Sequence, residues 1–218
     1  MRTLILCCAL AVASTAAAQS LGFGVQGNIS NLQLSANVKQ IVGVQSSATN
    51  TALEEVYGLG VGGGAHLDLN LPIISLRLSG DYMSLSPNAD KFKTWLQSYL
   101  GSGVTSVAVD GGTITEYSLQ LNVKLVILPV PVFHPYVTAG GGLAHVKMDD
   151  AKITINGTIT LPQQALIDEQ TVSTLNGGVG VDLVLGSVSV YGEVKVNVFY
   201  ISEGHGTYLP IATVGVTF

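Results

Sequence analysis

The last eleven residues of the chain place an apolar or aromatic side chain at almost every second position. Tyr208, Val214, Val216 and Phe218 share one face of an extended strand, whereas residues such as Thr213 fall on the other. A period of two predicts a β-strand with two different environments. The apolar face carries no charge, and in a soluble protein such a strand would invite edge-to-edge aggregation. What this face contacts therefore decides the fold.

Seven further segments alternate in the same way. They cover residues 21–34, 57–69, 74–82, 116–125, 133–148, 175–185 and 188–200. In 133–148, three consecutive glycines leave open which face points inward. Charged residues make up only 11% of the chain, against roughly 25% in soluble domains. Yet no apolar run after residue 18 approaches the roughly 20 residues of a membrane helix. The alternatives are a tightly buried β-core and a transmembrane β-barrel.

The links between these segments alternate in length. Short links cover 70–72, 128–132 and 186–187, long links cover about 35–54, 86–112 and 149–170, and the last, 202–207, is moderate. Short turns at one rim and long loops at the other are typical of a bacterial outer-membrane barrel, with the short rim periplasmic. A soluble up-and-down barrel has the same strand count but need not separate its loops in this way.

The side chains on the two faces favour lipid outside and a hydrated interior. Five tyrosines on the apolar face lie at strand ends next to the long links and predict an aromatic girdle: Tyr57, Tyr82, Tyr117, Tyr200 and Tyr208. The other face carries both signs of charge and predicts a polar network in the lumen: Asp68, Arg77, Asp81, Glu116, Lys124, Asp182, Glu193 and Lys195. We therefore predict an all-β fold, an eight-stranded antiparallel up-and-down transmembrane β-barrel with short periplasmic turns and long extracellular loops.

The amino terminus has the three regions of a secretory signal peptide. Arg2 precedes an apolar run, and three alanines lead to Gln19, so we predict cleavage after Ala18. Residues 1–18 are then the signal peptide and 19–218 one barrel domain. Both cysteines lie in the removed segment, which leaves the mature chain without a disulfide or a thiolate metal site. The formal net charge of −5, with no run of Lys or Arg, argues against nucleic-acid binding.

With these features, the chain resembles the small eight-stranded outer-membrane β-barrel proteins of the OmpA/OmpX type. The resemblance covers the whole mature chain and rests on the strand layout. Its most specific carriers are the terminal strand, ending in Phe218, and the segment 135–142. The resemblance implies that Tyr208, Val214, Val216 and Phe218 form a signal for the outer-membrane assembly machinery, which with membrane lipids is an expected partner. It also implies residence in the cell outer membrane.

Two motifs invite a chemical function. Gly22, Gly24 and Gly27 match the spacing of a dinucleotide fingerprint, but the motif needs a preceding strand and a following helix, and here it continues as a strand. His66 shares the lumen face with Asp68, and His145 approaches that face near the opposite rim, yet no three ligands converge at metal-site spacing. We predict no catalytic, cofactor or metal site, and lipid-modifying catalysis stays the least favoured alternative.

Residues 91–100 are the only segment with a helical period. Its apolar stripe consists of Phe92, Trp95, Leu96 and Tyr99. Such a helix either packs on the barrel mouth or lies in the outer leaflet with Trp95 inserted.

The expected function follows from the barrel's size. Eight strands leave an interior about filled by side chains, so we expect no general pore. A structural or surface-interaction role through the extracellular loops is the first expectation, with an unknown extracellular ligand. A narrow channel for ions or small apolar molecules is the alternative.

Overall fold

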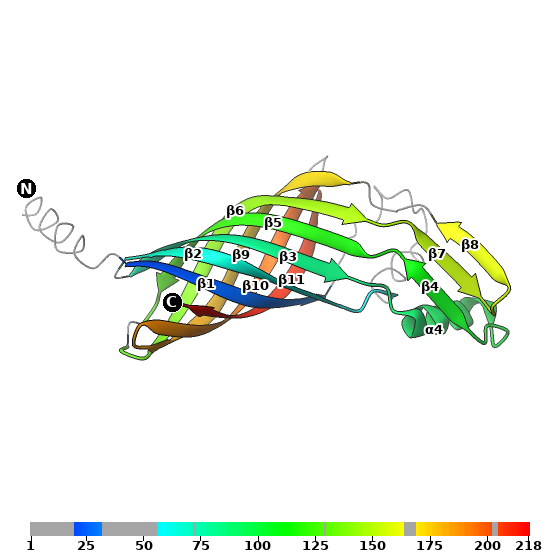
Figure 1. Ribbon diagram of the computed structural model, residues 1–218, viewed down its shortest axis with the longest axis horizontal. Helices are drawn as coiled ribbons and strands as arrows, with labels where there is room; N and C mark the ends of the chain where they lie inside the picture. The colour runs from blue at the N-terminus through cyan, green and yellow to red at the C-terminus, as the bar shows by residue number, and fades with distance from the viewer. Residues whose placement is uncertain (1–19, 32–55, 72, 129, 164–168, 202–204) are drawn as a thin grey trace, which may run out of the picture.

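The computed structural model describes residues 20–31, 56–71, 73–128, 130–163, 169–201 and 205–218. Eight strands form one closed antiparallel barrel (Figure 1). They are β1 (Ser20–Asn31), β2 (Leu59–Asn70), β3 (Ile74–Leu85), β5 (Ile114–Val126), β6 (Phe133–Met148), β9 (Gln170–Leu185), β10 (Val188–Ile201) and β11 (His205–Thr217). Each strand pairs with its predecessor and successor along the barrel, and β1 pairs with β11. The predicted fold class is confirmed. The predicted signal peptide and the first long link lie outside the described residues.

The barrel strands turn their apolar side chains outward. In β1 the Phe23 side chain is 54% exposed, whereas Asn28 is 4% exposed and points inward. The alternation follows from the period of two along each strand. It also fixes the orientation of β6, where Tyr136 and Thr138 are buried inside and Val137 is exposed. A hydrophobic outer face with a polar interior is the pattern of a membrane barrel.

Two of the predicted long loops contain regular structure, which includes the helix predicted over 91–100. The link between β3 and β5 holds helix α4 (Ala89–Leu100) and strand β4 (Val107–Gly111), and the link between β6 and β9 holds β7 (Ala151–Ile155) and β8 (Ile159–Gln163). The three short strands form a separate sheet in the order β4-β7-β8. We call α4 and this sheet the extension. Figure 1 shows it beyond the end of the barrel opposite the C terminus. The barrel therefore has a short-turn end and a long-loop end.

The link predicted over 202–207 was also wrong in extent. Strand β11 already begins at His205, which pairs with Ile201. The link between the last two strands is therefore shorter than predicted and covers 202–204, which lie outside the described residues.

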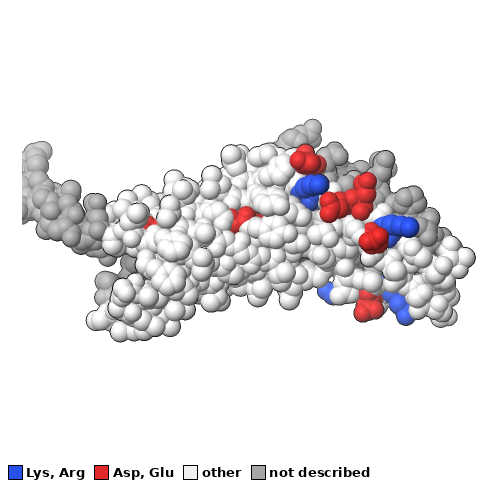
Figure 2. Space-filling view, in the orientation of Figure 1, with Lys and Arg blue, Asp and Glu red and all other residues white. Residues whose placement is uncertain are grey.

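The outer face of the barrel is almost free of charge. Figure 2 shows Lys, Arg, Asp and Glu gathered at the long-loop end, with only two small red patches on the remainder of that face. On the outer face, Tyr82 and Tyr117 pair across two strands with ring centroids 5.3 Å apart. Tyr200 and Tyr208 are exposed too. Four of the five predicted girdle tyrosines thus lie on the outer face.

The barrel closes where β1 meets β11. Seven residue pairs are in register, from Gly24 with Thr217 to Ser30 with Ile211. The rings of Phe23 and Phe218 stack on the outside with centroids 5.9 Å apart. No helix of the described chain combines the length and the apolar character needed to cross a membrane.

Candidate functional site

The interior at the short-turn end is built around a buried ion pair. Asp68 and Arg77 are cross-strand partners on β2 and β3. Arg77 donates from Nε and one terminal nitrogen to the two carboxylate oxygens of Asp68, both at 2.7 Å. Its guanidinium lies 4.2 Å from the centre of the Tyr191 ring. Such bidentate geometry, reinforced by a cation–π contact, compensates both charges inside the barrel.

A second pair lies beside the first. Lys124 donates to both carboxylate oxygens of Asp182 at 3.1 and 3.0 Å. The ammonium group of Lys124 lies 4.1 Å from the centre of the Tyr136 ring. The hydroxyl of Tyr136 donates to Glu193 at 3.0 Å. Strands β5, β6, β9 and β10 are therefore connected through polar side chains as well as through their backbones.

Towards the middle of the barrel the network becomes looser. Asp81 accepts hydrogen bonds from the side-chain amides of Gln26 at 2.5 Å and Asn28 at 2.7 Å. The ammonium of Lys195 lies 3.9 Å from Glu193. The interior face holds all eight predicted lumen residues: Asp68, Arg77, Asp81, Glu116, Lys124, Asp182, Glu193 and Lys195.

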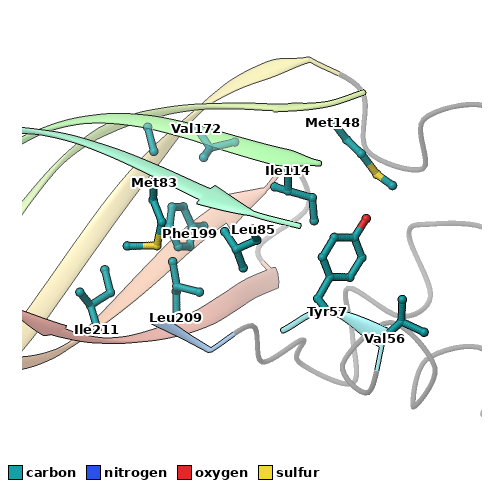
Figure 3. Packing of buried hydrophobic residues seen from close by; sticks show 11 residues of the cluster. Val56, Tyr57, Met83, Leu85, Ile114, Met148, Val172, Phe199, Leu209 and Ile211 are labelled. Carbon is teal, nitrogen blue, oxygen red and sulfur yellow. The ribbon is translucent and has the colours of Figure 1, made fainter. Parts of the chain in front are cut away.

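At the long-loop end the interior is apolar. Figure 3 shows buried apolar side chains from several strands converging inside the barrel. We call these residues the interior apolar cluster: Val56, Tyr57, Met83, Leu85, Ile114, Ala144, Met148, Val172, Phe199, Leu209 and Ile211. Close packing of such side chains excludes water. The cluster closes the end of the lumen nearest the extension.

The sequence does indicate this cluster, although the alternation of apolar and polar residues along a strand does not reveal it. Met83 and Leu85 continue the inward register of Arg77 and Asp81 along β3. The inward face therefore changes from charged to apolar along a single strand. A prediction that assigns one character to each face of a strand overlooks the change.

Tyr57 is a correction to the predicted girdle. Its side chain is 3% exposed and belongs to the interior apolar cluster. It precedes β2, forms an isolated bridge with Pro87, and donates its hydroxyl hydrogen to the carbonyl oxygen of Gly112 at 2.5 Å. Burial raises the pKa of Tyr57 to about 12. The side chain therefore joins the β2 end to the β4–β5 connection instead of facing lipid.

We expect this buried hydroxyl to make stability fall at high pH. The Tyr57 hydroxyl ionises near pH 10.0 in the unfolded chain and near pH 12 in the folded barrel. Between these two pH values the folded state keeps a proton that the unfolded state has lost. The free energy of unfolding therefore decreases as pH rises from 10 to 12. The loss is about 2 to 3 kcal/mol. Urea unfolding at pH 9 and pH 12 should show this decrease, and the decrease should be that much smaller in Tyr57→Phe. Equal decreases in both proteins would contradict the assignment.

Comparison with known protein families identifies the family of this barrel. The chain matches the family described as "Outer membrane protein beta-barrel domain" over residues 3–208. The protein belongs to this family. The predicted resemblance is confirmed, and the chain is an outer-membrane β-barrel.

Several solved structures are similar to this family member at low sequence identity. Neisserial surface protein A from Neisseria has 14% identity and a TM-score of 0.48, covering 91% of this chain and 97% of that chain. Ail of Yersinia pestis has 12% identity and a TM-score of 0.43, covering 92% and 97%. The N-terminal barrel domain of Pseudomonas aeruginosa OprF has 15% identity and a TM-score of 0.39, covering 91% and 96%. No curated protein matches the chain.

His66 and His145, the two histidines singled out in the sequence, lie on opposite faces of the barrel wall. His66 is buried beside Asp68 at 3.9 Å, and its Nε2 lies 2.9 Å from the hydroxyl of Thr217. The expected approach of His145 to the lumen was wrong, because His145 lies on the outer face, with Glu169 at 3.2 Å. Within the described part of the chain, no group of three or more His, Cys, Asp or Glu side chains could hold a metal ion.

The glycine motif belongs to the barrel seam. Gly24 pairs with Thr217 on one side and His66 on the other. A Cβ at Gly24 would lie 2.2 Å from the backbone oxygen of Val216 and 2.3 Å from Nε2 of His66. Glycine is required there because a neighbouring backbone and a buried ring already occupy the space.

Helix α4 packs against the mouth of the barrel. Asn88 caps it by accepting hydrogen bonds from two backbone N–H groups of the first turn, which explains why it begins before the predicted residue 91. Phe92 stacks on Trp95 and packs against the interior apolar cluster, and Leu96 is buried. These contacts favour the first of the two predicted positions. The side chain of Tyr99 lies outside the described part of the structure.

One side chain adds several hydrogen bonds to the backbone pairing of the extension. Asn156, between β7 and β8, accepts from the backbone N–H groups of Thr105 and Ser106 and donates to the carbonyl of Gly103. Its φ of 52° is left-handed, a conformation that asparagine tolerates better than most residues. Asn156 therefore joins the β7–β8 hairpin to the segment that follows α4.

We expect Asn156→Ala to loosen the extension without opening the barrel. The change removes four side-chain hydrogen bonds, including one from the Thr105 hydroxyl, and places alanine at a left-handed position, a local loss of roughly 2 to 3 kcal/mol. Protease cleavage near Gly103 should accelerate, whereas heat-modifiable gel migration should not change. Asn156→Gly is the matched control, because it loses the same bonds without the backbone strain. Unchanged cleavage in both variants would contradict the role of Asn156.

Proposed function

We propose that this outer-membrane barrel has a structural or surface-interaction role that its extracellular extension performs, and that it forms no general pore. The observation that carries the proposal is the contrast between the two ends. The lumen holds buried ion pairs and is closed at one end by the interior apolar cluster, whereas the long-loop end builds a helix and a sheet beyond the barrel. Because the long links form a helix and a sheet outside the barrel, a function at the surface is favoured over passage through the lumen.

The outer face supports the membrane part of this proposal. Tyr82, Tyr117, Tyr200 and Tyr208 are exposed on the outer face of the barrel, and we propose that they lie at the outer lipid interface. Tyr208, Val214 and Phe218 are exposed on the outer face of β11, with Val216 half-buried between them. We propose that these four residues carry the signal for the outer-membrane assembly machinery. We propose no enzymatic activity.

The first test is conductance. Purified barrel in planar bilayers should give no reproducible single-channel steps, because the interior apolar cluster excludes water from one end of the lumen. Steps that change in Glu193→Gln or Lys195→Gln would support the narrow-channel alternative and overturn the proposal.

The second test separates the extension from the barrel. Residues 88–111 and 149–168 are replaced by short glycine–serine links, and the variant is expressed in a host strain lacking the protein. Heat-modifiable migration should be kept, whereas the envelope or adhesion defect of the null strain should persist. Full restoration of the wild-type phenotype would show that the extension is not the functional part. As a matched control, the single change Asn156→Gly should restore at least part of the phenotype.

A further inference from the structure

The charges inside the barrel do not balance. The interior residues form three close pairs of opposite charge, Asp68 with Arg77, Asp182 with Lys124, and Glu193 with Lys195. Two interior carboxylates are left over. In the part of the chain that the structure describes, neither Asp81 nor Glu116 has a cationic side chain within ion-pair distance. Uncompensated charges in a closed interior are costly, and the hydrogen bonds that Asp81 accepts from Gln26 and Asn28 supply no counter-charge.

Both unbalanced carboxylates line the same small cavity. The cavity lies between the polar network and the interior apolar cluster and has a volume of about 10 Å³. Asp81 and Glu116 come from neighbouring strands, since Asp81 pairs with Ser118, two residues from Glu116 on the same face. One oxygen of Asp81 is buried without a hydrogen-bond partner among the described residues. The cavity therefore has room for one small ligand beside two negative charges.

A neutral side chain also points to a ligand here. Asn197 lines the same cavity and is 0% exposed. Neither its amide oxygen nor its amide nitrogen has a hydrogen-bond partner among the described residues. Buried amides are rarely left in this state, because an unsatisfied polar group costs about 1 to 3 kcal/mol. An occupant of the cavity would satisfy the oxygen.

We propose that this cavity binds a single hard divalent cation, calcium or magnesium. Oxygen atoms of Asp81, Glu116 and Asn197 are the donors that such cations prefer, and two charges of the ion would balance the two excess carboxylates. Lys195 also lines the cavity, but its ammonium group lies 3.9 Å from Glu193 and 3.4 Å from Gln120. The interior apolar cluster covers the site from the long-loop end, so the ion enters as the barrel folds and exchanges slowly afterwards.

The test refolds the full chain into detergent free of lipopolysaccharide, with either calcium and magnesium or EDTA present. After a desalting step, the metal content is measured by mass spectrometry. We expect roughly one divalent ion per barrel, and a thermal unfolding midpoint several degrees lower for protein folded in EDTA. The double variant Asp81→Asn with Glu116→Gln should retain no ion, and its midpoint should not depend on EDTA.

Matched variants separate this site from surface binding. Asp149→Asn removes an exposed carboxylate at the long-loop end and should leave metal content unchanged. Glu116→Gln alone should lower metal retention at least tenfold. This single variant replaces the double variant in the test if the double variant fails to fold. Equal metal content in wild type and Glu116→Gln would overturn the proposal. The proposal would also be overturned if wild-type protein retained no metal and its thermal unfolding midpoint rose at acidic pH. Protons, and not a metal ion, would then neutralise the two carboxylates.

Discussion

Asp68→Ala is expected to destabilise the barrel by about 3 to 5 kcal/mol, measured by urea unfolding in detergent or lipid vesicles. Asp68 is the bidentate partner of Arg77, and both side chains are almost fully buried. Removing one partner leaves the other charge in the interior without compensation, which costs far more than the pair contributes. The expected loss is a large part of the stability of a single domain.

Two comparisons test the physical reason for this loss. Asp149→Ala removes the carboxylate of an exposed pair with Lys147 and should cost no more than about 1 kcal/mol. The double change Asp68→Leu with Arg77→Leu should recover most of the loss, because it leaves no unpaired charge. If the double variant is as unstable as Asp68→Ala, the pair contributes directly and the explanation based on an orphaned charge is wrong.

Gly24→Ala should prevent the barrel from closing. The added methyl group would overlap the Val216 carbonyl and the ring of His66, and neither can move without breaking the seam or the contact of His66 with Thr217. Overpacking costs typically about 1 to 3 kcal/mol, and more where backbone must shift. We expect the heat-modifiable fraction of refolded protein to fall sharply.

Gly27→Ala is the matched control on the same strand. Gly27 points outward, and a Cβ there meets nothing within 4 Å. This change should leave folding unaffected or slightly improved, because alanine orders the unfolded chain. His66→Ala combined with Gly24→Ala should recover part of the loss by removing the ring. Equal folding of the Gly24 and Gly27 variants would contradict the role assigned to the seam glycine.

The sequence was sufficient for the barrel because the period of two is local. The alternation within each strand shows which face is apolar. The separation of short and long links then predicts that the strands close into an up-and-down barrel. The orientation of β6 was left open because Gly140, Gly141 and Gly142 have no side chains to indicate a face. In the structure their neighbours Tyr136 and Thr138 decide it.

The extension and the interior apolar cluster depend on contacts that no local pattern describes. Strand β4 pairs with β7 from a different link, for example Val109 with Ile153, and neither five-residue strand is distinctive alone. Tyr57 was misplaced for a similar reason. It continues the alternation of β2, but the strand begins only at Leu59, after Gly58, so the Tyr57 ring packs inward.

The pairing of β1 with β11 sets the order of events in assembly. Asn28 and Thr213, which share a hydrogen bond across the seam, are 185 positions apart, so this contact cannot form until the last strand has been synthesised. Before then the sheet is an open ribbon with two unpaired edges, which hydrocarbon does not tolerate. Membrane insertion and closure must therefore be coupled, and a growing chain has no stable half-barrel at which to stop. Shielding of the two free edges is what any factor that escorts this chain to the membrane has to provide.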